Sequence, residues 1–118
     1  MTLITDEDRE ALLQNGRAAA RSDSFDPIPV VKIFAPDGRS TWLLSELDPS
    51  DPDLAFGLAD LGQGAPELGN FMLSEIAEVS GTAGLPPERD RFFRATAPLS
   101  VYAAAARAAG AIINLRAV

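Results

Sequence analysis

Four blocks of the chain are rich in β-branched, aromatic and other apolar side chains, which favour strands. The blocks are residues 30–35, 41–47, 54–61 and 67–73. Turn signals at 36–38 and 62–66 and a polar segment at 48–53 separate them, because proline presets a turn dihedral angle and glycine accepts a positive one. Strands joined by such short connections predict a four-stranded antiparallel meander rather than parallel strands with crossover helices.

The chain before the first predicted strand carries the signature of a helix start. Thr5 can cap a helix whose first turn, residues 6–8, is entirely acidic, and acids there favour the positive end of the helix dipole. The pair Asn15-Gly16 either ends this helix or lets it continue through residues 18–20. We therefore expect an N-terminal helix ahead of the sheet.

Two more helices are predicted after the strands. Ser74 is placed to cap a short helix that runs to Val79. Pro98 suits the first turn of a last, alanine-rich helix, and Gly110 is an end signal for it. The face of that helix expected to pack on the sheet consists of Leu99, Tyr102, Ala103, Ala106 and Ala109. The predicted fold class is α+β: an N-terminal helix, a four-stranded antiparallel meander sheet, a short helix, and a C-terminal alanine-rich helix packed on the sheet.

Length and composition indicate a single domain, residues 1–118. A chain of 118 residues with 47% apolar side chains can form one hydrophobic core without disulfide bonds or structural metals. It contains no cysteine, which suits a reducing compartment. The N-terminal segment lacks the regions of a secretory signal, and no apolar run reaches the ~18 residues of a membrane span. We therefore expect a cytoplasmic protein without a membrane segment.

The absence of histidine and cysteine narrows the chemistry further. Zero His and zero Cys exclude Ser-His-Asp and Cys-His catalysis and zinc sites built from thiolates and imidazoles. A metal would have to be a hard cation bound by oxygen. A general acid or base would be a carboxylate, Tyr102, Lys32 or the N-terminal amine.

The net charge of −7 is distributed unevenly along the chain. Residues 40–88 hold nine acids and no base, whereas residues 89–118 hold one acid and five arginines. Because nucleic-acid phosphates repel an acidic chain, direct binding of nucleic acid is not expected.

Carboxylates at the ends of the predicted strands form one candidate site. Glu46 and Asp48 are two residues apart, so they point to one face of a strand, which Trp42 shares. Glu67 lies beside the second hairpin turn and could approach them. Such carboxylates could hold Mg²⁺ or Mn²⁺ and activate a water for phosphodiester cleavage. The alternative is that these acids gather at strand ends and turns because they are solvated there.

The stretch LPPERDRFF at 85–93 is a second candidate site. Its charged run, with Glu88, Arg89 and Asp90, has three interpretations. Arg89 could anchor a carboxylate or phosphate of a ligand, it could pair across the fold with the three carboxylates named above, or the run could be a solvated loop. We favour the pairing, which makes Arg89 a structural clasp. We also expect both phenylalanines of the stretch to pin it to the core, since two adjacent ones rarely both stay exposed.

Four segments carry a resemblance to a known family. They are FAPDGRSTWLLSELDP (34–49), FGLADLG (56–62), PELGNFMLSEI (66–76) and GLPPERDRFF (84–93). Over about residues 2–94 the chain resembles DUF2958, a bacterial family of unknown function whose small proteins are often carried on plasmids and integrated mobile elements. The C-terminal helix and tail, residues 96–118, lie outside the resemblance. The positions that match its motifs are Trp42, Glu46, Asp48, Phe56, Gly57, Glu67, Gly69, Glu88, Arg89 and Asp90. The resemblance implies no activity and suggests accessory work around DNA transfer or maintenance.

Because no complete catalytic set is present, we expect a non-enzymatic binding or regulatory module. It would be an accessory of a mobile element, act through an unknown protein partner and use no cofactor. One alternative is an acidic DNA mimic, suggested by the base-free segment 40–88, whose carboxylates would have to be spaced like phosphates along one surface. The other is a metal-dependent phosphodiesterase or nuclease using Glu46, Asp48 and Glu67, with Arg89 on the substrate phosphate. The sequence leaves the oligomeric state open.

Overall fold

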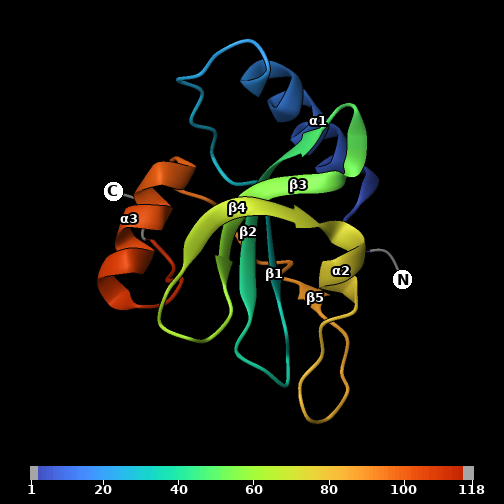
Figure 1. Cartoon of the computed structure of the whole chain (residues 1–118), viewed down its shortest axis with the longest axis vertical. Helices are drawn as coiled ribbons and strands as arrows, with labels where there is room; N and C mark the ends of the chain where they lie inside the picture. Colours follow the sequence, from blue (N-terminus) through green and yellow to red (C-terminus); the bar gives the residue numbers. More distant parts are fainter. Residues whose placement is uncertain (1–2, 116–118) are drawn as a thin grey trace.

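The computed structural model describes residues 3–115, which form three helices and five strands (Figure 1). In chain order they are α1 (Asp6–Ala19), β1 (Val31–Phe34), β2 (Thr41–Asp48), β3 (Asp51–Asp60), β4 (Glu67–Met72), α2 (Leu73–Ala77), β5 (Glu88–Arg89) and α3 (Leu99–Ala109). All five strands belong to one antiparallel sheet in the order β4-β3-β2-β1-β5. The α+β class and the antiparallel meander of β1 to β4 are confirmed, and the sheet has one strand more than predicted.

The additional strand, β5, is only two residues long, which is too short for the alternation of apolar and polar residues that identifies a strand in a sequence. Arg89 pairs with Ile33 of β1, and the N–H of Asp90 donates to the carbonyl oxygen of Lys32 at 2.8 Å. This pairing fixes where the stretch LPPERDRFF runs along the edge of the sheet.

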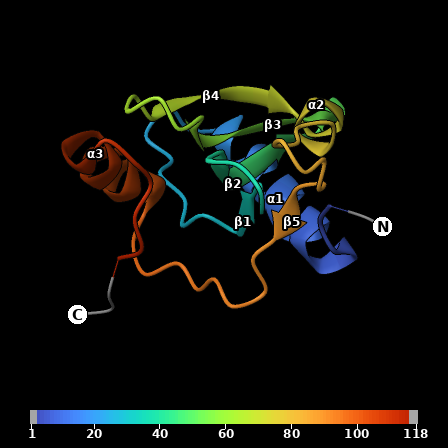
Figure 2. The same cartoon turned by 90° about the horizontal axis from the view of Figure 1, so that it is seen from below.

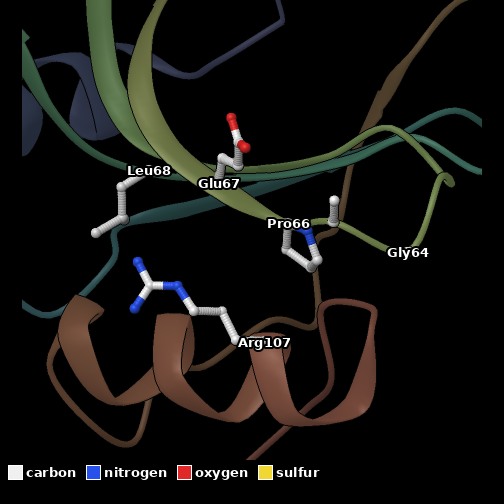
Figure 3. Close-up of a pocket in the computed structure, with 6 residues that line it drawn as sticks. Gly64, Pro66, Glu67, Leu68 and Arg107 are labelled. Carbon is white, nitrogen blue, oxygen red and sulfur yellow. The ribbon is translucent and has the colours of Figure 1, made fainter.

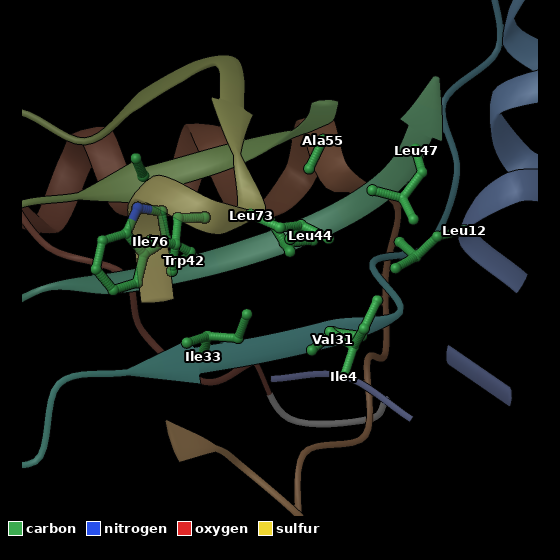
Figure 4. Close-up of a cluster of buried hydrophobic side chains, with 11 residues drawn as sticks. Ile4, Leu12, Val31, Ile33, Trp42, Leu44, Leu47, Ala55, Leu73 and Ile76 are labelled. Carbon is green, nitrogen blue, oxygen red and sulfur yellow. The ribbon is translucent and has the colours of Figure 1, made fainter. Parts of the chain in front are cut away.

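Helices cover both faces of the sheet (Figure 2). α1 and α2 lie on one face, and the core beneath them includes Leu12 of α1, Trp42 and Leu44 of β2 and Ile76 of α2 (Figure 4). α3 lies on the other face. The core beneath it contains Leu43, Leu58, Leu99, Tyr102, Ala103 and Ala106. The alanine-rich helix therefore packs on the sheet as predicted, although Ala109 is exposed.

The start of α1 agrees with the prediction. The Oγ1 atom of Thr5 accepts the N–H of Asp8, and Oδ2 of Asp8 accepts the N–H of Thr5, each at 3.0 Å. This reciprocal capping box satisfies two backbone donors that a helix start leaves free.

Asn15 and Gly16 lie inside α1 and do not end it, because this part of the helix packs on the backbone of β2. β1 pairs with β2 only as far as Leu44, and next to this point Asn15 Nδ2 donates to the carbonyl oxygen of Ser45 at 2.9 Å. A Cβ atom on Gly16 would lie 1.9 Å from the carbonyl oxygen of Leu47. Glycine at this position lets α1 cover the part of β2 that β1 leaves unpaired.

α2 starts without the predicted serine cap. Its N-cap is Met72, which makes no side-chain hydrogen bond, and Ser74 lies within the helix. The backbone N–H and the Oγ of Ser74 donate to the carboxylate of Asp53 at 3.0 and 2.7 Å. Asp53 is part of β3, because a turn of only residues 49–50 joins β2 to β3 where a longer polar loop was predicted. An aspartate of a neighbouring strand thus takes the role expected of the serine.

α3 ends at Gly110, as predicted, with a φ angle of 77° that suits glycine. The segment after it returns to the body of the protein, where the N–H of Ile112 donates to Oδ2 of Asp60 at 3.1 Å. Among residues 3–115, none of the helices combines the length and the apolar character that crossing a bilayer requires.

The close approach of Gly16 to β2 yields a prediction about stability. At an exposed helical site, Gly→Ala adds about 1 kcal/mol of stability. Here we expect Gly16→Ala to lower the free energy of unfolding by about 1–3 kcal/mol, because the methyl group forces α1 away from β2. Urea denaturation measures the change, with exposed Gln14 as the matched control: Gln14→Ala should shift it by less than about 0.5 kcal/mol. A Gly16→Ala protein as stable as wild type would contradict the packing.

Candidate functional site

Two of the three carboxylates predicted to converge, Asp48 and Glu67, lie near opposite ends of β3, and Glu46 lies between them, opposite Phe56. Asp48 pairs with Asp51 at the start of β3, whereas Glu67 pairs with Ala59 near its end. A strand of that length separates these pairs by roughly 26 Å. Within the part of the chain that the structure describes, no group of three or more His, Cys, Asp or Glu side chains is placed to hold a metal ion. The structure therefore does not bring Glu67 to the other two carboxylates.

A β-bulge decides which way Glu46 and Asp48 point. The register between β2 and β3 shifts between Leu44 and Glu46, so Trp42, Leu44 and Leu47 all face the core beneath α1. Glu46 then points to the opposite face, because a bulge reverses the alternation of a strand. The prediction that Trp42 shares a face with Glu46 and Asp48 is corrected, and Trp42 is a core residue with only 2% of its surface exposed.

Glu46 and Asp48 share a hollow of about 280 Å³, which Phe56, Asn70 and the C-terminal turn of α1 also line. Burial, assisted by the negative charge of Asp48, raises the pKa of Glu46. Glu46 and Asp48 are the two carboxylates that line this hollow, together with the amide side chain of Asn70.

Arg89 is a clasp, but it holds α1 and not the sheet carboxylates. Its Nε and Nη2 atoms lie 2.5 and 3.1 Å from Oδ2 and Oδ1 of Asp8, which is a two-pronged ion pair. The side chain of Asp8 is 9% exposed and that of Arg89 is 30% exposed. Since Asp8 also closes the capping box with Thr5, one carboxylate joins the first turn of α1 to β5.

This ion pair shifts the pKa of both groups. Burial by itself raises the pKa of Asp8, but the hydrogen bonds from Arg89 and Thr5 outweigh it, so that the pKa is lowered. The hydrogen bond to Asp8 raises the pKa of Arg89. Both partners are therefore charged at neutral pH.

The other charges of the run have separate roles. Glu88 is exposed and points away from the face that Arg89 occupies. Oδ1 of Asp90 accepts the N–H of Phe92 at 2.9 Å. Arg91 has no carboxylate partner among residues 3–115, and its guanidinium carbon lies 5.7 Å from the centre of the Phe92 ring.

The two adjacent phenylalanines of the stretch differ in burial. Phe93 packs edge-on against Tyr102, with ring centres 6.2 Å apart, and it belongs to the core beneath α3. Phe92 is 84% exposed, more than any other large apolar side chain in the described range. The prediction that both pin the loop is therefore correct for Phe93 and wrong for Phe92. We call Arg91 and Phe92 together the Arg91–Phe92 ridge.

Two hollows flank the Arg91–Phe92 ridge. The larger, of about 710 Å³, lies between the N-terminal segment, the end of α2 and residues 86–91, and Arg91 lines it. The smaller, of about 290 Å³, lies between residues 90–94 and the segment after α3, and Phe92 lines it. An arginine stacked on a phenylalanine between two hollows is a protruding feature that another protein surface can contact. Neither side chain is a nucleophile.

A further hollow, of about 460 Å³, lies between α3 and the turn before β4 (Figure 3). Arg107 of α3 points toward Leu68, while the carboxylate of Glu67 points away from Arg107 (Figure 3). A single arginine without a second polar side chain is too little to define a ligand site.

Sequence reasoning missed the roles of Asp8 and Phe92. The spacing of Thr5 and Asp8 matches a capping box, but nothing local connects Asp8 to Arg89, which is 81 residues away. A signal for Phe92 did exist: Asp90 favours a turn by accepting the N–H of the residue two positions on, and Arg91 and Phe92 lie in such a turn.

Comparison with known proteins gives one match. The sequence model of a family described as "Protein of unknown function (DUF2958)" matches residues 3–113. The expectation that the C-terminal helix lies outside the resemblance is therefore wrong, because the matched range includes α3 as well as the sheet. Neither the curated proteins nor the solved structures contain a match.

The Asp8–Arg89 pair yields a prediction about stability and pH. We expect Asp8→Asn to lower the free energy of unfolding by about 1–3 kcal/mol at neutral pH, because Arg89 loses its charged partner. The pKa of Asp8 is lowered by folding, so its contribution is complete above the ordinary carboxyl range and is lost as the pH falls. The difference between wild type and variant should therefore shrink toward about pH 2.

Urea denaturation at the two pH values measures this difference. Asp6→Asn is the matched control, since Asp6 is an exposed acid in the same helical turn and should change stability by less than about 0.5 kcal/mol. A deficit of the Asp8→Asn protein that is equally large in acid would show that the ion pair is not its cause.

The contrast between the two phenylalanines yields a second prediction. We expect Phe93→Ala to lower the free energy of unfolding by about 2–4 kcal/mol, since a partly buried ring leaves a cavity under α3. Phe92→Ala should change it by less than about 0.5 kcal/mol, because the ring is in water. Thermal and urea denaturation compare the two variants, and equal losses of stability would refute the assignment of Phe92 to the surface.

Proposed function

Starting from the fact that the chain belongs to DUF2958, a family of proteins of unknown function, we propose that it is a non-enzymatic binding module that acts through a protein partner. The partner contacts the Arg91–Phe92 ridge. The observation that carries this proposal is the 84% exposure of Phe92 beneath a stacked arginine.

The composition of the ridge favours a protein interface. Aromatic residues and arginine are enriched at the energetic centres of such interfaces. An exposed phenylalanine gains about 1.5–3 kcal/mol when a partner buries it. A stacked guanidinium adds a polar group whose apolar faces are already partly dehydrated. Phe92 lines one of the flanking hollows and Arg91 lines the other, so a partner has room to contact the ridge on both sides.

The charges around the ridge indicate the chemistry of the partner. Asp8 neutralises Arg89, and the carboxylate of Asp90 accepts a backbone N–H. Arg91 and Arg94 have no carboxylate partner in the described chain. These two guanidinium groups stand beside the acids Glu88 and Asp90 and are available to pair with a partner, which favours a partner segment that combines an acidic residue with an apolar one.

An accessory role for a mobile element, in the cytoplasm, remains part of the proposal. Its support is the resemblance of the sequence to small proteins of plasmids and integrated elements. Such an accessory would act by binding its partner through the ridge, since binding requires a contact surface but no catalytic group.

The two alternative functions have less support. The enzyme would need Glu67 beside Glu46 and Asp48, but Asp48 and Glu67 pair with opposite ends of β3, and no group of three such side chains in the described residues is placed to hold a metal ion. The DNA mimic would need its acids along one surface, yet Asp60 is buried and accepts the N–H groups of Gly62 and Ile112.

A displayed library of random peptides tests the proposal. We expect selection on the purified protein to enrich peptides that place Asp or Glu beside an aromatic or aliphatic residue. Phe92→Ala and Arg91→Glu should weaken binding of an enriched peptide by about tenfold or more, because each removes a central contact. Fluorescence anisotropy with a labelled peptide measures the affinity.

The control for this experiment is Val101→Ala, which shortens an exposed apolar side chain on α3 and should leave the affinity unchanged. The proposal fails if no peptide is enriched. It also fails if the Phe92→Ala and Val101→Ala proteins bind the enriched peptides equally well.

A further inference from the structure

The sheet has two edges, and they differ in how well they resist pairing with another strand. At one edge, β5 is two residues long, follows Pro86 and Pro87 and lies in a run of alternating charges. Short length, proline and charge all discourage edge-to-edge pairing. β4 forms the other edge. It has six residues, contains no proline and no lysine, and carries a single charge, Glu67, at its first position.

The outer side of β4 is open. β4 pairs with β3 on one side, and in Figure 2 no segment of the described chain runs along the other. Every second residue of an antiparallel edge strand directs its N–H and C=O away from its neighbour. β4 therefore offers a row of backbone donors and acceptors over about 20 Å.

We infer that β4 pairs antiparallel with β4 of a second copy of this chain, so that the two sheets become one. Identical antiparallel strands are related by a two-fold axis, so the free N–H and C=O groups of each strand form hydrogen bonds with the same groups of the other. With the axis beside Gly69, Leu68 stands opposite Asn70 of the second copy and Glu67 stands opposite Phe71 of the second copy. No carboxylate then faces another carboxylate across the pair.

The side chains of the β3–β4 hairpin favour a second copy over a charged foreign strand. Positions 68–72 are uncharged, so a charged strand would gain no ion pair along them. β4 also carries Leu68, an exposed large apolar side chain, and with the axis beside Gly69 it lies diagonally across the pair from Leu68 of the second copy.

The size and charge of this interface set its strength. A pair of six-residue strands lies at the small end of protein interfaces, below about 1,200 Å², so the dimer is weak. Each copy carries a net charge of −7, and the repulsion between them is strongest at low salt. The dimer therefore forms at high protein concentration and is favoured by salt.

Sedimentation equilibrium over a range of protein concentrations, at about 0.5 M salt to screen the repulsion, tests the inference. The mass of the wild type should rise from that of a 12.5 kDa monomer toward twice this value. The double variant Leu68→Lys/Asn70→Lys should stay at the monomer mass, because lysines of the two copies would face each other. Leu85→Lys is the matched control: it changes an exposed leucine far from β4 and should dimerise as the wild type does.

Hydrogen exchange supplies a second measurement that needs no variant. Backbone amides of β4 should exchange more slowly as the wild-type concentration rises, while exchange in β5 should not change. The inference is overturned if the wild type stays at the monomer mass, if it grows beyond a dimer, or if the double variant associates as the wild type does. Peptide binding at the Arg91–Phe92 ridge does not enter either readout, so the two proposals fail separately.

Discussion

Aspartate carboxylates that reach across the fold hold the irregular parts of this protein in place. Residues 78–98 contain only the two residues of β5 as regular structure, so most of their backbone groups lack a strand or helix partner. A carboxylate supplies such a partner when it accepts hydrogen bonds from backbone N–H groups or from an arginine, and its negative charge strengthens these bonds. Five aspartates act in this way on distant segments: Asp8 on Arg89, Asp26 on Ser100, Asp37 on Gly81 and Leu85, Asp53 on Ser74, and Asp60 on Ile112.

This arrangement gives the acidic composition a structural explanation. Loss of hydration raises the pKa of Asp37, but the N–H groups of Leu85 and Gly81 outweigh it, so that the pKa is lowered. A carboxylate with a lowered pKa stabilises the fold above the ordinary carboxyl range and loses this effect as the pH falls. Asp53 and Asp60 of the base-free segment, like Asp8, Asp26 and Asp37 outside it, thus connect separate segments by hydrogen bonds, and each lies where two segments meet. That is why they do not line up along one surface as the phosphates of DNA do.

The sequence predicted what depends on neighbouring residues and failed where distant segments meet. The capping box at Thr5, the hairpin turns and the glycine end of α3 all follow from local signals. The bulge between Leu44 and Glu46 has no local signal, because a register shift is a property of two strands. One extra residue there moved Glu46 to the face opposite Trp42 and removed the predicted carboxylate site. Arg89 was predicted to pair with the carboxylates of the sheet and pairs with Asp8 of α1 instead, because its partner depends on where β5 lies, which only the assembled sheet determines.

The order of the strands connects the two proposed surfaces. β4 and β5 form opposite edges of the sheet, and the Arg91–Phe92 ridge follows β5 directly in the chain. Pairing through β4 would leave both ridges of a dimer exposed, at the two far ends of one continuous sheet. A partner with two acidic and apolar segments could then bind both ridges, and the second contact would form within a complex that already exists. Such linked contacts raise the overall affinity by roughly 10²–10⁴-fold if the partner spans the distance, so weak association at each surface is sufficient for tight binding of a repeated or dimeric partner.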